Sequence, residues 1–252
     1  MNLKTCFLLT VGVLNCVGLA GAHPPATRLP DVTVKASAAS TANIRMAYGQ
    51  GIAVTVARNA YLWTSTDGTD WIKRPSATVS SLYDIAFGNG VFVAVGNEGA
   101  LVTSPDGVSW TGRDSRTDER LRSVTFGNGK FVAVGYAGTV ITSADGVKWT
   151  VRDSGTEARL QAVAFERGTF VAVGWGGVIL TSANGSRWTT RRPGSAGRFD
   201  GVTYQDGGFV VSVANRAAFV SADGRRWRTA PQPSAITSPV SSKSAPLVSS
   251  RQ

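Results

Sequence analysis

The sequence predicts an all-β fold, a β-propeller of five four-stranded blades built from 39-residue repeats. Tryptophan recurs every 39 residues, and each of these tryptophans follows a turn of the pattern Ser-x-Asp/Asn-Gly. A second turn in each unit ends in a glycine with the same spacing: Gly51, Gly90, Gly129, Gly168 and Gly207. No segment shows the apolar stripe of a long helix. Four short strands in about 40 residues, repeated, are typical of a propeller blade.

The third repeat shows how each unit divides. Residues 121–126 form the first predicted strand, and Asn128-Gly129 suits a hairpin turn because both residues tolerate a positive φ. Residues 131–134 are apolar at successive positions, as expected of a strand covered on both faces. Residues 139–143 and 147–152 complete the blade on either side of the Ser-Ala-Asp-Gly turn. A lone blade cannot bury its faces, so the five repeats are expected to fold together.

The turn and its tryptophan carry a resemblance to a known family. They resemble the Asp-box of bacterial neuraminidase repeats, which occurs in sialidases and in photosystem II assembly-factor propellers, with one residue fewer than the usual Ser-x-Asp-x-Gly-x-x-Trp. The resemblance covers residues 43 to about 230 and implies a structural role for the turn residues and tryptophans. These are Asp67, Asp106, Asp145, Asn184, Asp223, Trp71, Trp110, Trp149, Trp188 and Trp227. Asx-type turns give the acidic residues the same role independently.

The flanks of the repeats suggest export. Residues 1–22 are expected to be a signal peptide, with Lys4 before an apolar run too short to span a bilayer and a small-residue cleavage pattern at Ala22. Lipidation of Cys16 is the alternative, and Asn15 fits that motif poorly. Residues 23–42 are a predicted linker, residues 43–230 the propeller, and residues 231–252 a disordered tail rich in proline and serine. The expected location is periplasmic or secreted.

Composition excludes several kinds of active site. Cys6 and Cys16 lie in the predicted leader, and the single histidine, His23, lies at the predicted new N-terminus. A Ser-His-Asp triad, a catalytic thiolate and the common zinc sites are therefore not expected, and neither is a cofactor. The net charge of +10 favours an anionic partner, either an acidic glycan or a protein client. Export disfavours nucleic acid, and the alternative is that the charge serves solubility alone.

The candidate site is one rim of the propeller, where the connections between blades meet the turns between strands two and three. The repeats diverge most on this rim, which favours recognition there. Arginines recur in two registers, just after strand four and just before strand one, and two aromatic residues lie in adjacent turns. The residues are Arg74, Arg113, Arg152 and Arg191, then Arg120, Arg159 and Arg198, and finally Tyr136 and Trp175. Guanidinium groups suit carboxylate, sulfate or phosphate ligands.

Other interpretations of this rim remain open. Acidic residues lie in the same connections and would pair with the arginines in a solvated surface of little energetic value: Asp114, Asp118, Glu119, Asp153 and Glu157. Tyr136 and Trp175 would then only cover their own hairpins. The preferred function is a non-catalytic binding or scaffolding propeller. The alternatives are a glycan-binding lectin and, disfavoured by its five blades, a sialidase-like hydrolase. The ring is either closed or a partial ring completed by dimerisation.

Overall fold

A computed structural model of the chain describes residues 45–57, 60–191, 193–194, 197–214 and 216–230. The predicted signal peptide, linker and tail lie outside these residues, as do residues 43–44 of the predicted propeller. The described part is all-β, with five antiparallel sheets of four strands each, and it confirms the predicted fold class.

Each repeat forms one sheet, and the strands in each sheet follow chain order. The first blade contains β1 (Arg45–Gly49), β2 (Ile52–Val56), β3 (Tyr61–Ser65) and β4 (Ile72–Pro75). The second contains β5 (Leu82–Gly88), β6 (Val91–Gly96), β7 (Leu101–Ser104) and β8 (Thr111–Gly112). The third contains β9 (Leu121–Gly127), β10 (Lys130–Gly135), β11 (Val140–Ser143) and β12 (Thr150–Arg152).

The last two blades follow the same plan. The fourth contains β13 (Leu160–Glu166), β14 (Thr169–Gly174), β15 (Ile179–Ser182) and β16 (Thr189–Arg191). The fifth contains β17 (Gly201–Gln205), β18 (Gly208–Val213), β19 (Arg216–Ser221) and β20 (Arg228–Thr229). Single 3-10 turns, η1 (Asn97–Gly99) and η2 (Trp175–Gly177), connect strands two and three in the second and fourth blades.

The Ser-x-Asp-Gly turn shortens the fourth strand of each blade. In the third blade, Asp145 Oδ1 accepts the backbone N–H groups of Val147 and Lys148, at 2.8 and 2.9 Å. These residues therefore belong to the turn, and β12 begins at Thr150 rather than at the predicted residue 147. The buried Trp149 donates its Nε1–H to Gly146 O at 2.8 Å, which ties the indole to the same turn.

The hydrophobic core lies between the blades. Each interface joins the valine-rich face of one sheet to the phenylalanine-bearing face of the next. Val93 and Val95 of the second blade pack with Phe131 and Ala133 of the third, and all four side chains are fully buried. Phe131 also packs beside Trp149, with ring centroids 6.3 Å apart. Because every interface needs two sheets, no blade is an independent folding unit.

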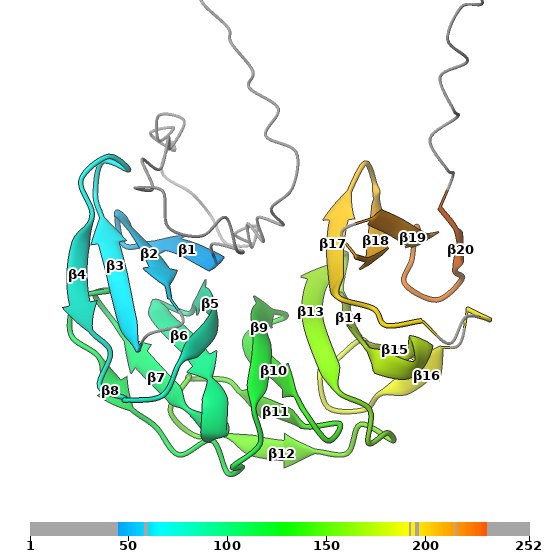
Figure 1. Ribbon diagram of the computed structural model, residues 1–252, viewed down its shortest axis with the longest axis horizontal. Coiled ribbons are helices and arrows are strands. Elements are labelled where there is room, and N and C mark those ends of the chain that lie inside the picture. Colours follow the sequence, from blue (N-terminus) through cyan, green and yellow to red (C-terminus); the bar gives the residue numbers. More distant parts are fainter. Residues whose placement is uncertain (1–44, 58–59, 192, 195–196, 215, 231–252) are drawn as a thin grey trace, which may run out of the picture.

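The blades follow one another around an arc (Figure 1). The first strands of consecutive blades contact one another in the order β1, β5, β9, β13 and β17, which places them on the inside of the arc. Figure 1 shows the first and fifth sheets separated by the open side of the arc. The described residues therefore favour a partial ring over the closed five-bladed ring, which is the simpler architecture from sequence.

Candidate functional site

A chain of polar groups on the first strands links four blades near the inside of the arc. Asp84 is buried, and its Oδ2 accepts Ser123 Oγ–H at 2.7 Å and Val124 N–H at 3.0 Å. Ser123 Oγ in turn accepts the N–H of Val163 in the fourth blade, at 3.2 Å. On the other side, Arg45 of the first blade lies 3.9 Å from Asp84. This chain fixes neighbouring blades relative to one another beneath the rim.

Backbone hydrogen bonds fix the rim loops above this chain. The turn between strands two and three in the third blade donates Tyr136 N–H to Arg120 O at 2.9 Å. In the next blade, Trp175 N–H donates to Arg159 O at 3.0 Å. Gly138 N–H reaches forward to Ala158 O in the following connection, at 2.9 Å. Each turn is thus held between two inter-blade connections, and its aromatic side chain lies between the arginines of those connections.

The result is an alternation of guanidinium groups and aromatic rings. Arg120 and Arg159 place their Cζ atoms 5.0 and 4.8 Å from the ring centroid of Tyr136. Arg159 is shared with Trp175, at 4.5 Å, and Arg198 lies 4.0 Å from the same indole. All these distances are within the range of cation–π attraction, about 6 Å from the ring centroid.

The alternation continues toward the inside of the arc. Tyr83, on β5, lies 5.5 Å from Arg120 Cζ and 4.8 Å from Arg122 Cζ. Arg120 is further oriented by its Nε–H, which donates to Asn97 Oδ1 at 2.8 Å. We call the complete set the arginine–aromatic ladder: Arg122, Tyr83, Arg120, Tyr136, Arg159, Trp175 and Arg198.

Two carboxylates of the inter-blade connections, those of Asp114 and Asp153, are engaged in their own turns rather than with the ladder. Asp114 accepts Arg116 N–H at 2.8 Å and pairs with the Arg116 side chain at 3.0 Å. Asp153 accepts Gly155 N–H at 2.8 Å. Arg116 pairs with Asp114 and Arg45 with Asp84, and neither of these ion pairs includes Arg120, Arg159 or Arg198. The exposed Arg159 and Arg198 therefore keep their charge available to a partner.

The arginines of the register just after strand four have a different environment. These half-buried side chains donate Nε–H to the threonine hydroxyl of strand three in the same blade, at 2.9 to 3.3 Å. The pairs are Arg74–Thr64, Arg113–Thr103, Arg152–Thr142 and Arg191–Thr181. The geometry assigns this register to tying strand four to strand three, and the ladder contains only the register before strand one.

Three contributors to the ladder region, Tyr83, Arg122 and Asn97, were not predicted from the sequence. The signal for the first two is their spacing: Tyr83 and Arg122 are 39 residues apart, so they occupy the same strand-one position in adjacent blades. Both residues lie on first strands, on β5 and β9, whereas the predicted site contained only residues of the loops and connections. No cluster of three or more potential metal-ligating side chains occurs among the described residues. The helices in that same part of the chain include none long and apolar enough to cross a membrane.

No protein-family model and no curated protein sequence matches this chain. Solved structures do resemble it. YCF48 bound to a D1 peptide is 18% identical, with a TM-score of 0.53, over 73% of this chain and 68% of that one. YCF48 from Cyanidioschyzon merolae is 16% identical, with a TM-score of 0.54, over 67% and 63%.

Propellers of other kinds resemble the chain to the same degree. The WD40 propeller domain of Doa1 is 12% identical, with a TM-score of 0.55, over 70% of this chain and 62% of that one. The GH74 enzyme of Niastella koreensis is 22% identical, with a TM-score of 0.51, over 74% and 31%. The structural similarity to these proteins shows that the chain has a β-propeller fold. At such low sequence identities, and with proteins of different kinds among the matches, it shows the fold alone.

Proposed function

We propose that this protein is an exported, non-catalytic binding or scaffolding propeller whose arginine–aromatic ladder receives an acidic segment of a protein client. The observation that carries the proposal is the ladder itself. Arg120, Arg159 and Arg198 are stacked on aromatic rings, and none of them is in an ion pair with a carboxylate of the described residues. Like charges repel, so gathering them on one rim favours an anionic partner.

Stacking prepares the arginines for binding. A guanidinium group lying on an aromatic face keeps the N–H groups of its edge free for hydrogen bonds, and its rotamers are already restricted. The entropy normally lost when a long side chain binds, about 0.5–1.5 kcal/mol per residue, is thereby reduced. Planar donor forks in a row suit carboxylate groups spaced along a peptide. The solved complex of YCF48 with a D1 peptide, a structure of similar fold, supports a protein segment as the partner.

The ladder also bears on the lectin alternative. A sugar ring stacks on the open face of an aromatic side chain. Tyr136 already lies beside Arg120 and Arg159, and Trp175 lies beside Arg159 and Arg198. These rings are engaged by guanidinium groups, which favours recognition through the arginines over stacking of a sugar on the rings.

Two finer features belong to the same proposal. We infer that the repeats are Asp-box repeats, because Ser143 Oγ–H donates to Asp145 Oδ1 at 2.9 Å and Gly146 N–H donates to Ser143 Oγ at 2.8 Å. Equivalent bonds close the turns of the other four blades. Export rests on residues 1–22 of the sequence, and mass determination of the N-terminus of protein secreted from cells would test it.

Binding to an acidic peptide tests the ladder. Titration calorimetry with a glutamate-rich peptide would compare the chain with a triple variant, Arg120→Gln, Arg159→Gln and Arg198→Gln. The matched control removes the same charge from the opposite rim through Lys148→Gln, Arg187→Gln and Arg226→Gln. Losing three charge-assisted contacts should weaken binding by about a hundredfold or more, whereas the control should stay within about threefold. Equal losses in the two triple variants would refute the proposal, because they would show that the charge acts diffusely.

A further inference from the structure

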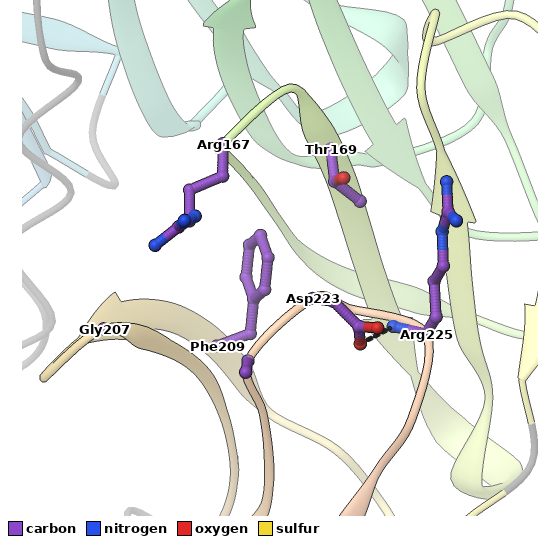
Figure 2. A pocket seen from close by; sticks show the side chains of 7 residues that line it. Arg167, Thr169, Gly207, Phe209, Asp223 and Arg225 are labelled. Atoms are coloured by element: carbon purple, nitrogen blue, oxygen red, sulfur yellow. Dashed lines mark hydrogen bonds between the residues drawn. The ribbon is translucent and has the colours of Figure 1, made fainter.

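A second cationic surface lies at the junction of the fourth and fifth blades and shares no residue with the ladder. A cavity of about 450 Å³ is lined there by residues of the β13–β14 hairpin, of the β17–β18 hairpin and of the Ser-x-Asp-Gly turn of the fifth blade: Arg167, Thr169, Gly207, Phe209, Ala222, Asp223 and Arg225. Figure 2 shows Arg167 and Arg225 on opposite sides, with Thr169 and Phe209 between them. The volume of this cavity is within the range of about 300–1,000 Å³ typical of ligand sites.

The cavity occurs where this junction departs from the repeat. At the two preceding junctions the hairpin residue is asparagine, and its amide reaches across to the next blade. Asn89 Nδ2 donates to Ala144 O at 3.0 Å, and Asn128 Nδ2 donates to Ala183 O at 3.1 Å. The equivalent residue of the fourth blade is Arg167, which instead donates to Tyr204 Oη at 3.5 Å.

The opposite wall departs from the repeat as well. Arg225 occupies the position held by Val108, Val147 and Ser186 in the preceding blades. Repetition copies surface residues without selection for a site, but it does not explain two new arginines that face one cavity. Asp223 is the carboxylate in the cavity lining, and it is engaged in its own turn because its Oδ1 accepts the N–H groups of Arg225 and Arg226. Glu166 and Asp206 lie on the two hairpins, so acidic groups are also present nearby.

The cationic surface extends beyond this first cavity. Arg225 also lines an adjoining cavity of about 310 Å³, together with Thr190, Arg191, Pro193 and Trp227. Arg167 lines the first cavity, Arg225 lines both, and Arg191, whose Nε–H donates to Thr181 Oγ1, lines the second. Three guanidinium groups separated by two spaces lined with hydroxyl and apolar groups match a linear chain of rings that carries anionic groups at intervals.

We propose that this junction binds an acidic oligosaccharide, with its sulfate or carboxylate groups on Arg167, Arg225 and Arg191 and its sugar rings in the two cavities. Thr169 and Thr190 supply hydroxyl groups for ring oxygens, and Pro193 and Trp227 supply apolar surface. A single-stranded nucleic acid would need open aromatic faces for base stacking. Phe209 is fully buried and Trp227 half-buried, so such faces are scarce at this junction.

Titration calorimetry with a heparin-derived hexasaccharide tests the proposal, with maltohexaose, inorganic sulfate and an oligothymidylate as comparison probes. Arg225→Val and Arg167→Asn restore residues of the other repeats, so both variants should fold. Each should weaken binding of the hexasaccharide about tenfold, the expected loss of one charge-assisted contact. Lys148→Val removes one charge at the equivalent turn of the third blade and should change affinity by less than about twofold.

The remaining probes decide the ligand class. The hexasaccharide should bind more tightly than sulfate and maltohexaose, because the site recognises charges and rings together. Equal affinity for sulfate alone, tighter binding of oligothymidylate, or the same loss in the Lys148→Val variant would each overturn the proposal. The ladder triple variant should keep its affinity for the hexasaccharide at this junction, which separates this site from the acidic-peptide site on the rim.

Discussion

Removing the Asp84 carboxylate should destabilise the fold more than any single surface substitution. In Asp84→Ala, Ser123 loses the acceptor of its O–H and Val124 loses that of its N–H, which lie 2.7 and 3.0 Å from Asp84 Oδ2. The Ile85 N–H, 3.0 Å from Oδ1, and the guanidinium of Arg45, at 3.9 Å, lose their partner too. Because Asp84 is only 2% exposed, water does not readily replace it.

The size of the effect follows from these contacts. An orphaned buried donor costs about 1–3 kcal/mol, and breaking a buried charge pair costs about 3–5 kcal/mol in total. We expect Asp84→Ala to lose about 4 kcal/mol, which is a fall of about 8–16 °C in Tm for a domain of this size. Asp84→Asn keeps one acceptor oxygen and most of the shape, so it should lose about half as much.

Thermal unfolding followed by circular dichroism measures both variants. Ser123→Ala supplies a further check, because Ser123 Oγ also accepts Val163 N–H in the fourth blade. Its effect should not add to that of Asp84→Ala, since the two residues share one hydrogen bond and contacting residues couple by about 0.5–3 kcal/mol. A fall of less than about 2 °C for Asp84→Ala, or simple additivity, would show that the polar chain does not hold the blades together.

Three further predictions concern the turns and the ladder. The N–H groups of Ser109 and Val108 lower the pKa of Asp106 to about 2, and equivalent backbone N–H groups also lower the pKa values of Asp67, Asp145 and Asp223. A folded pKa below the unfolded value near 3.8 means that the stabilisation is complete above that pH and is lost as the pH falls toward about 2. The Tm should therefore fall between pH 4 and pH 2, and Asp106→Asn should lessen that fall in a series of thermal scans. Gly138→Ala should lower the free energy of unfolding in urea by several kcal/mol, because the φ of Gly138 is +67° and a Cβ there would lie 1.7 Å from Thr156 O. Gly176→Ala should lower it by only about 1 kcal/mol, because Gly176 has a similar φ of +73° but open space around the position of a Cβ. Trp175→Leu should weaken binding of an acidic peptide about threefold to tenfold without loss of charge, because Arg159 and Arg198 lose a stacking surface; unchanged affinity would mean that stacking does not prepare the arginines.

The repeat made the fold predictable, and local hydrogen bonding explains where the prediction was less accurate. The apolar run at residues 131–134 and the Asn128-Gly129 turn predicted the β9–β10 hairpin. Apolar residues at successive positions indicate a strand covered on both faces, and asparagine and glycine indicate a turn with positive φ. Asn128 and Gly129 do adopt positive φ values of 50° and 73°. The fourth strand was predicted too long because the Asp145 carboxylate captures two N–H groups that alternation alone would assign to the strand. Ring closure depends on small rotations between blades, which a residue pattern does not encode locally.

The candidate site was predictable only in part, for a related reason. Spacing placed Arg120, Arg159, Tyr136 and Trp175 on one rim, but it treated both arginine registers alike. What separates them is the position of the nearest acceptor or ring. Arg152 lies beside strand three, where Thr142 Oγ1 accepts its Nε–H at 2.9 Å, whereas Arg159 lies between two aromatic rings of adjacent turns. These arginine–aromatic contacts join residues that are 16 or more positions apart in the sequence and close in space, so the sequence of a single repeat does not predict them.

In a repeat protein, the positions that are copied and those that depart from the copy carry different information. The phenylalanine of strand two recurs as Phe92, Phe131, Phe170 and Phe209, all fully buried, because each inter-blade interface requires it. Nothing in that requirement explains aromatic residues at only two of the strand two–three turns, or arginines replacing asparagine and valine at only one junction. Such departures exchange an inter-blade hydrogen bond to a backbone carbonyl for a longer one to Tyr204 Oη, or bring like charges together. A ligand bound there would supply a compensating interaction, so these departures are the places where we expect binding to have shaped the surface.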